Sequence, residues 1–332
     1  MINSVTLDFK VSNCQYRCAH CDGSKSDPCS PISLEKIQNT VDSFLRHKGS
    51  IYENLFVFIS NSAFLYNDFP ELVDFLNSHG VRYAKEPING VRFDDAFFKT
   101  QFPGIASSSL DTVRVTLFGL EPTHDRFAGF KNSFHELMAF ARAFIKHQKL
   151  VVFHLYITPE NIGEIDALQQ QIEDAFPESV ITHEYSNCYK DNYRRRKQFL
   201  LPRSCKEKAQ KWNLSLVTEE ELAESCKGKK PLVWHNNLWI RTFGNGDCNA
   251  AIFPLGSFYG VGNMNTKTPE ALIAQSVETM KHIEETLPTY DCLIDEVHDP
   301  NDPFLYAPDD ALGLWWSRYS RKHEITSCNP LV

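Results

Sequence analysis

Asn13-Cys14-Gln15-Tyr16-Arg17-Cys18-Ala19-His20-Cys21 is the most informative stretch of this chain, because it holds three cysteines in the spacing C-x3-C-x2-C. It follows residues 5–11, where apolar and polar side chains alternate with the period of a β-strand. Thiolates that a short loop brings together suit a soft metal centre, since iron-sulfur clusters and zinc select thiolate ligands. The stretch therefore predicts a metal centre at the C-terminal end of a first strand.

The number of thiolates narrows the kind of metal centre. A structural zinc site needs four protein ligands and usually draws them from two paired knuckles. This loop offers three thiolates and has no neighbouring C-x2-C pair. A four-iron cluster held by three cysteines keeps one iron open for a small molecule. Two alternatives stay open: a zinc loop completed by Cys29 or His20, and a chance grouping of thiols.

At these residues the sequence resembles the radical S-adenosylmethionine superfamily, whose hallmark is this cysteine spacing with an aromatic residue, here His20, before the third cysteine. The resemblance implies that Cys14, Cys18 and Cys21 bind a [4Fe-4S] cluster and that S-adenosylmethionine chelates the open iron. It implies reductive cleavage of this cofactor to a 5′-deoxyadenosyl radical that abstracts hydrogen from a substrate. It also places His20 beside the adenine and requires an external one-electron donor of the flavodoxin or ferredoxin type.

Composition sets limits on location and partners. The 332 residues are 42% hydrophobic, enough for one large domain and a smaller appendage. The net charge of −8 gives no general attraction to nucleic acid or anionic lipid. The N-terminus lacks the pattern of a secretory signal, and no apolar run approaches the ~18 residues of a membrane-spanning helix. Ten cysteines without a small-domain disulfide pattern favour the reducing cytoplasm. The sequence predicts a cytoplasmic protein without nucleic-acid or membrane partners.

Strand and helix patterns alternate through the N-terminal part. We expect strands at residues 5–11, 55–59, 81–84, 113–118, 150–157 and 179–185. We expect helices after Ser33, at about 70–79, after Ser133 and at 161–176. Six such units are too few for a closed eightfold barrel and match the open barrel of the superfamily. The predicted fold is α/β: a partial (β/α)6 TIM-like barrel over residues 1–190 and a smaller α+β extension over residues 191–332.

Residues 114–129, R-V-T-L-F-G-L-E-P-T-H-D-R-F-A-G, resemble the fourth strand and following loop of radical enzymes that carry a SPASM or twitch extension. In those enzymes a Gly, a His-Asp-Arg and a second Gly recur before a capped helix. Here Ser133 and Glu136 are expected to form the capping box, and Thr116 is expected to contact the cofactor. The triplet at 124–126 either holds the loop through its own hydrogen bonds or contacts substrate or cofactor.

The loop after the second strand departs from the family. Its usual Gly-Gly-Glu-Pro holds the amino group of S-adenosylmethionine, whereas this chain has Ser60-Asn61-Ser62-Ala63. Ser60, Asn61 and Ser62 offer oxygen acceptors to an ammonium group, so we expect them to bind the cofactor with a changed geometry. The missing acid also motivates an alternative: a scaffold that keeps the cluster and no longer turns over.

The C-terminal part resembles a degenerate SPASM or twitch module, in residues 238–248, 260–264 and 269–273. Two cysteines expected of that module are replaced by Ala251 and Lys267. Four other cysteines are candidate ligands of a second iron-sulfur cluster, with buried inert thiols as the alternative: Cys205, Cys226, Cys248 and Cys292. Cys248 is also a candidate hydrogen donor to a substrate radical, because the resemblance places its hairpin at the barrel mouth.

The substrate and the type of reaction stay open. The resemblance of the loop at 119–126 to SPASM-type enzymes favours a peptide or a natural-product intermediate such as an amino sugar, and it leaves oxidoreductase, epimerase and lyase chemistry open. A zinc-stabilised binding module is the alternative outside enzymes. Near the C-terminus, we expect Trp315, Trp316 and Tyr319 to pack in the core, and Asp302, Asp309 and Asp310 to form a solvated loop.

Overall fold

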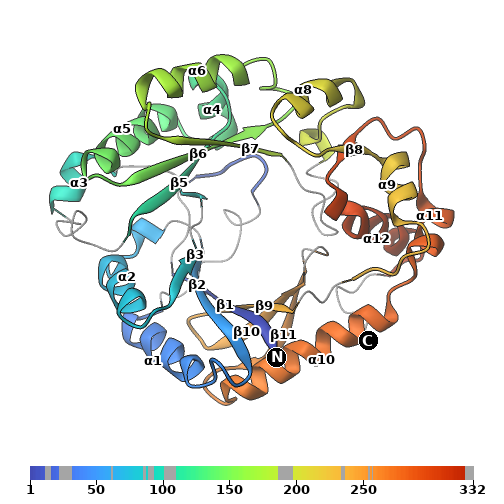
Figure 1. The fold of residues 1–332 in the computed structure, drawn as a ribbon, viewed down its shortest axis with the longest axis horizontal. Helices are drawn as coiled ribbons and strands as arrows, with labels where there is room; N and C mark the ends of the chain where they lie inside the picture. The colour runs from blue at the N-terminus through green and yellow to red at the C-terminus, as the bar shows by residue number, and fades with distance from the viewer. Residues whose placement is uncertain are drawn as a thin grey trace.

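The computed structural model arranges the chain as a ring in which strands lie toward the inside and most helices lie outside (Figure 1). It describes residues 1–11, 16–21, 32–60, 63–84, 87–88, 93–100, 110–185, 197–232, 236–252, 255 and 257–325. No helix in these ranges combines the length and the apolar character needed to cross a bilayer.

Seven parallel strands form the N-terminal part of the ring. They are β1 (Ile2–Lys10), β2 (Tyr52–Ser60), β3 (Arg82–Ala84), β4 (Pro87–Ile88), β5 (Thr112–Leu117), β6 (Leu150–Ile157) and β7 (Val180–Tyr185). Strands β1-β2-β3 belong to one sheet and β4-β5-β6-β7 to another. Two residues separate β3 from β4, so these short strands together occupy the third of six strand positions. The predicted partial barrel is confirmed, and the described strands do not close it.

The helices that follow these strands cover the outside of both sheets. They are α1 (Leu34–Leu45), η2 (Ala63–Leu65), α2 (Phe69–Ser78), α3 (Asp95–Thr100), α4 (Glu121–Ala128), α5 (Ser133–Lys146) and α6 (Ile165–Ala175). Helix α1 begins as predicted, because the Ser33 side chain accepts a hydrogen bond from the Lys36 amide at 3.3 Å.

Each strand has one apolar face toward the helices and one more polar face toward the inside of the ring. On β1, Val5, Leu7 and Phe9 are fully buried in the core that contains the apolar faces of the outer helices. Thr6, Asp8 and Lys10 alternate with them and lie on what we call the inner face. The alternation of apolar and polar residues in the sequence of β1 therefore matches its outer and inner faces.

The C-terminal extension continues the first sheet. Strands β9 (Asn237–Thr242), β10 (Asp247–Ile252) and β11 (Ser257–Asn263) are followed by α10 (Pro269–Thr286). Strand β9 pairs in parallel with β1, which gives the order β11-β10-β9-β1-β2-β3. The first strand is therefore interior to the sheet. A domain boundary at residue 190 stays a prediction, since residues 186–196 lie outside the described ranges.

A helical group lies between β7 and α10 in the ring (Figure 1). Its elements are η4 (Lys197–Phe199), η5 (Arg203–Cys205), α8 (Lys206–Lys211), β8 (Val217–Thr218), α9 (Glu219–Cys226), α11 (Tyr290–Val297), β12 (Leu305–Tyr306), η6 (Pro308–Asp310) and α12 (Ala311–Lys322). Strands β8 and β12 form a small antiparallel pair. Trp315 and Trp316 are buried, as predicted.

A buried ionic network holds this helical group together. Arg318 donates to Glu219 at 2.6 Å and to Asp302 at 2.7 Å, and both carboxylates are almost fully buried. Tyr306 donates a further hydrogen bond to Asp302, and Trp315 donates one to Glu219. The expectation of a solvated loop is right for exposed Asp309 and wrong for Asp302 and Asp310, which are buried. Arg318 and these donors compensate the burial of Asp302.

Replacing Arg318 with Ala leaves two buried carboxylates without their shared cation. We expect Arg318→Ala to lower the free energy of unfolding by about 3–5 kcal/mol. Lys322→Ala is the matched control, because Lys322 pairs with Glu296 in a half-exposed position, and such pairs contribute about 0–1 kcal/mol. Urea denaturation measures both variants. Equal losses in the two would show that the buried network contributes no special stability.

Candidate active site

The cysteine loop follows the C-terminal end of β1, the end at which parallel barrels place their active sites. Cys18 and Cys21 are partly exposed, and the Cys21 amide donates to the Cys18 carbonyl at 3.1 Å. This turn brings the two cysteines together. Cys14, with its expected role as the third ligand, lies outside the described residues. Asn61 and Ser62 lie outside them too, and of Ser60 only the backbone at the end of β2 is described.

The loop rests on the C-terminal end of α4. The Arg17 amide donates to the Ala128 carbonyl at 3.1 Å, and the Ala19 amide donates to the Phe127 carbonyl at 2.9 Å. Gly129 caps α4 with a φ of 64°, and a Cβ at this position would lie 2.9 Å from the Arg17 carbonyl oxygen. The second glycine of the motif therefore permits both the helix end and the close approach of the loop.

An aromatic cluster fixes the loop from the side. Tyr16 is buried in a group that includes Phe118, Phe127 and Tyr156. The His20 ring stacks on Tyr156 at 4.7 Å and on Phe127 at 5.4 Å between ring centroids. His20 keeps part of its surface exposed, so its expected contact with adenine stays a prediction that these protein contacts do not test.

The His124 side chain is a buried, neutral acceptor. Its Nδ1 accepts a hydrogen bond from the Phe118 amide at 3.2 Å, so the ring proton lies on Nε2. Burial lowers the pKa of His124 to about 4, against a small opposing effect of the Asp125 carboxylate. The residue thereby holds the turn between β5 and α4 and stays uncharged near neutral pH.

Asp125 caps the next helix. Its carboxylate accepts hydrogen bonds from the Asn132 amide at 2.6 Å, the Ser133 hydroxyl at 2.8 Å and the Phe134 amide at 2.9 Å. Burial works to raise the pKa of Asp125, but these hydrogen bonds hold it below its ordinary value. The predicted capping box of Ser133 and Glu136 is wrong, because Asp125, eight residues before Ser133, supplies the cap instead.

The open question on the His-Asp-Arg triplet receives a structural answer. Arg126 donates to Glu160 at 2.8 Å in an exposed ion pair, and His124 and Asp125 bind the backbone on either side of α4. All three side chains hold the segment that supports the cysteine loop. The segment is also a helix rather than a loop.

Sequence reasoning missed two residues that complete this support. Buried Asn161 donates from Nδ2 to the carbonyls of Phe118 at 2.9 Å and Tyr156 at 2.7 Å, which ties the ends of β5 and β6 together. Glu164 accepts from the Leu120 amide at 2.8 Å and from Thr123. An Asn four residues after the end of a strand, just beyond a Pro, was a visible signal, since its side chain often binds nearby backbone in turns. Because the Asn161 side chain belongs to the turn after β6, helix α6 begins at Ile165 and not at the predicted residue 161.

The inner faces of β5, β6 and β7 present polar side chains next to this support. Thr116, the expected cofactor contact, pairs in register with His154, so both lie on the inner face. His154 contacts the Thr182 hydroxyl at 3.0 Å, and Glu184 lies 3.7 Å from the same ring nitrogen. Burial, aided by the positive charge of Arg114, lowers the pKa of His154 to about 4. The wall near the cysteine loop is thus polar.

The cysteines of the C-terminal part occupy separate elements. Cys205 ends η5, Cys226 ends α9, Cys248 lies on β10 and Cys292 lies on α11. Among the described residues, no three Cys, His, Asp or Glu side chains form a group that could hold a metal ion. The second cluster is thus a prediction for which the described residues offer no ligand set.

Cys248 lies on the opposite side of the sheet from the inner face. It pairs with Thr242, whereas its neighbour Asn249 pairs with inner-face Arg241. Its thiol is buried and donates to the Gly246 carbonyl at 3.4 Å, and burial raises its pKa to about 11. The register thus turns the thiol away from the inside of the ring, and the role of hydrogen donor finds no support here. Lys267 occupies a position where the resemblance leads one to expect a cysteine ligand, and its side chain donates to the Val261 carbonyl.

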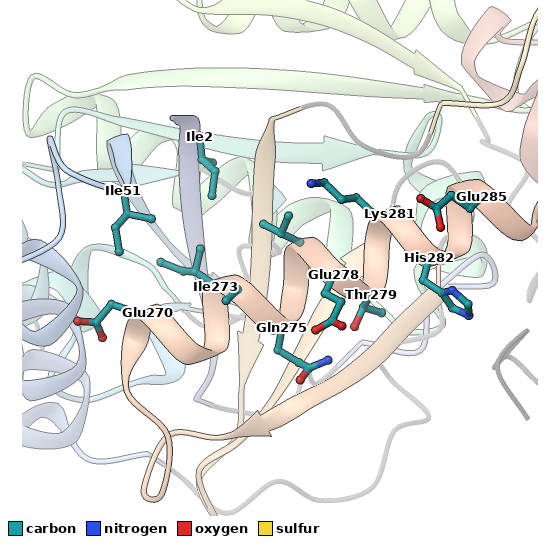
Figure 2. A pocket seen from close by; sticks show the side chains of 12 residues that line it. Ile2, Ile51, Glu270, Ile273, Gln275, Glu278, Thr279, Lys281, His282 and Glu285 are labelled. Carbon is teal, nitrogen blue, oxygen red and sulfur yellow. The ribbon is translucent and has the colours of Figure 1, made fainter.

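A pocket of about 880 Å³ lies between α10 and the N-terminal end of the sheet (Figure 2). Ile2 and Ile51 form its apolar side, and Glu270, Glu278 and Glu285 stand along the helix. Because Ile2 begins β1 and the cysteine loop follows the other end of that strand, this pocket is remote from the site. We assign it no part in the chemistry.

Comparison with known proteins places the fold. No family model and no curated protein matches the chain. Among solved structures, anSMEcpe with bound AdoMet and Cp18Cys peptide aligns over 97% of this chain and 98% of its own, with a TM-score of 0.57 and 14% identity. SuiB of Streptococcus suis bound to precursor peptide SuiA aligns over 94% and 76%, with a TM-score of 0.55 and 12% identity. Both are radical S-adenosylmethionine enzymes. At these identities the likeness shows that the chain has their fold.

Gly129→Ala tests the support of the cysteine loop. The added methyl group would press on the Arg17 carbonyl in addition to straining a positive φ, so we expect weaker folding and less iron bound after anaerobic reconstitution. Gly80→Ala is the matched control, because Gly80 has a φ of 62° and open space around it. We expect Gly129→Ala to lose at least about 1 kcal/mol more than the control in urea unfolding. Equal losses and equal iron content would contradict the role of Gly129.

Buried His124 predicts a pH dependence of stability. Its pKa is about 4 in the folded protein and 6.5 as its ordinary value, so the unfolded chain takes up the proton first as the pH falls. Stability is therefore complete above about pH 6.5 and is lost toward pH 4. His124→Asn, which keeps an acceptor for the Phe118 amide, should show a shallower loss in urea unfolding across this range. Some pH dependence should remain in the variant, because burial also lowers the pKa of His154. An equal loss of stability with pH in His124→Asn and the wild-type protein would argue against a buried neutral His124.

Proposed function

We propose that this chain is a radical S-adenosylmethionine enzyme that abstracts a hydrogen atom from a peptide or a related natural-product substrate. The observation that carries the proposal is the placement of the C-x3-C-x2-C loop. It follows the first strand of a six-unit parallel half-barrel and is held there by its own backbone bonds to α4. The fold shared with anSMEcpe and SuiB supports it.

The thiols fit the proposed cluster in their chemistry. Cys18 and Cys21 are partly exposed and are joined by a one-turn backbone hydrogen bond, which suits neighbouring ligands of one metal centre. We propose Cys14 as the third ligand and the fourth iron position as the binding site of S-adenosylmethionine. A [4Fe-4S] cluster held by these cysteines would supply the electron that cleaves S-adenosylmethionine, and so the 5′-deoxyadenosyl radical needed for hydrogen abstraction.

The residues of this chain position the cofactor and protect the reaction. We propose that Ser60, Asn61 and Ser62 accept hydrogen bonds from the amino group in place of the missing acid, and that Thr116 and His20 line the rest of the cofactor. The aromatic cluster around Tyr16 and Tyr156 excludes water from one side of the loop. Excluding water and stray side chains matters, because a primary carbon radical reacts with most groups that it meets.

The substrate proposal favours a peptide. One of the similar structures carries a Cp18Cys peptide and another a precursor peptide. An amino sugar-like intermediate is the second candidate, and whether the outcome is oxidation, epimerisation or elimination is not part of the proposal. We propose a flavodoxin or ferredoxin as electron donor and the reducing cytoplasm as the location, which suits the six free cysteines in the described ranges.

Cleavage of S-adenosylmethionine tests the proposal. The protein is reconstituted anaerobically with iron and sulfide, reduced with dithionite and given S-adenosylmethionine, and 5′-deoxyadenosine is measured by chromatography. We expect product from the wild-type protein, and none above background from Cys18→Ala or Cys21→Ala, because each variant removes a cluster ligand. Cys292→Ala, which removes a thiol of α11, is expected to retain activity.

The same preparation separates the alternatives. Iron and sulfide in a ratio near one with cleavage supports the enzyme. A stable cluster without cleavage would indicate an inactive scaffold, and zinc in place of iron would indicate a zinc-stabilised module.

A further inference from the structure

Arg241 occupies an unusual position on the inner face. It lies on β9 and pairs in register with Asp8 of β1. The Asp8 carboxylate is fully buried, and one of its oxygens accepts hydrogen bonds from the Arg241 Nε at 2.7 Å and the Trp239 Nε1 at 3.2 Å. The guanidinium is 29% exposed. Its Nε side is therefore fixed, and its terminal nitrogens lie toward the accessible side.

The guanidinium plane is also held from one side. Its central carbon lies 4.0 Å from the centroid of the Phe258 ring on β11, a stacking distance for a cation and an aromatic face. Phe258 itself is 37% exposed. A fixed Nε and a stacked plane leave little rotational freedom, so Arg241 would lose little entropy on binding a ligand.

The terminal nitrogens of Arg241 have no hydrogen-bond partner among the described residues. Asn249 of β10 pairs in register with Arg241 on the same face, and its carboxamide likewise makes no bond within that part of the chain. The next residue across the sheet is Gly260, which has no side chain to cover them. Arg241 and Asn249 are thus register neighbours on the inner face, and neither terminal group is bonded within the described part of the chain.

The donor set selects a carboxylate. Two parallel N–H groups of a guanidinium match the two oxygens of a carboxylate in a bidentate pair. The ion pair at Nε means that Asp8 already offsets part of the positive charge of Arg241, which favours a singly charged ligand over a phosphate dianion.

Arg241 also lies close to the proposed chemistry in the fold. Its register partner Asp8 is two residues before Lys10, the last residue of β1, and the cysteine loop begins beyond that point. A ligand on Arg241 would therefore lie on the inner wall, below the loop that carries Cys18 and Cys21.

We propose that Arg241, oriented by Asp8 and Phe258 and assisted by Asn249, binds a carboxylate of the substrate. The inference rests on the proposed function and narrows its substrate to a molecule with a carboxylate near the reacting carbon: an acidic side chain or a C-terminus of a peptide, or a small acid. Bidentate binding at this point would fix which carbon lies beside the cysteine loop.

A matched pair of probes tests the proposal without turnover. N-acetylphenylalanine and N-acetylphenylalaninamide differ in the carboxylate alone, and their binding to the reconstituted protein with S-adenosylmethionine present is measured by anaerobic calorimetry. We expect the acid to bind about 10- to 100-fold more tightly than the amide, the range of a hydrogen-bonded ion pair. Arg241→Gln should abolish the preference, and Arg241→Lys should retain only part of it.

Two further variants show whether a lost preference for the acid comes from the missing contact or from unfolding of the protein. Asn249→Ala leaves the Asp8–Arg241 pair in place and is expected to reduce the preference about threefold to tenfold. Arg82→Gln is the matched control, because Arg82 also stacks on a ring of this sheet, that of Phe56 at 5.4 Å, without a buried acid behind it. It should keep the full preference for the acid.

Several outcomes would overturn the proposal: no binding of the acid probe, equal binding of acid and amide, or a preference that survives Arg241→Gln. Loss of S-adenosylmethionine binding in Arg241→Gln would overturn it too, because Arg241 would then hold the cofactor carboxylate. Formation of 5′-deoxyadenosine is measured separately. A protein that cleaves the cofactor and ignores the carboxylate refutes this inference alone.

Discussion

The backbone contact between the cysteine loop and the C-terminal end of α4 is the constraint on which the candidate site depends. Two backbone hydrogen bonds, from Arg17 and Ala19, join the loop to the last turn of that helix, and the absent side chain of Gly129 allows the approach. Metal ligands on a short loop bind the metal more tightly when the fold already holds them, because less conformational entropy is then lost on binding. Helix α4 supplies this order from a segment about a hundred residues further along the chain.

The support itself consists of buried and half-buried polar side chains that bind the backbone. His124, Asp125, Asn161 and Glu164 each bind backbone amides or carbonyls at the ends of β5, β6 and their helices. Buried hydrogen bonds of this kind add rigidity because a broken one leaves an unsatisfied group. The His124-Asp125-Arg126 triplet therefore has the loop-holding role that was one of its two expected roles, and its expected contact with substrate or cofactor stays a prediction.

The division of each strand into an apolar outer face and a polar inner face links the barrel to its extension. Because β9 pairs with β1, Asp8 and Arg241 meet on the inner face although 233 positions separate them. The same register turns Cys248 toward the opposite face. One strand pairing thus decides both which side chains can meet a ligand and which cannot.

The sequence by itself determined the order of elements and the cysteine loop. Alternation in residues 5–11 marked β1, Ser33 marked the start of α1, and the C-x3-C-x2-C spacing marked the proposed metal centre, because each signal is local in the chain. Only the tertiary structure decided the roles of Asp125, Asp302 and Cys248. Their surroundings come from distant segments: the cap of α5, the Arg318 network and the register of β10. Burial and pairing between such segments depend on packing, which a local pattern does not encode.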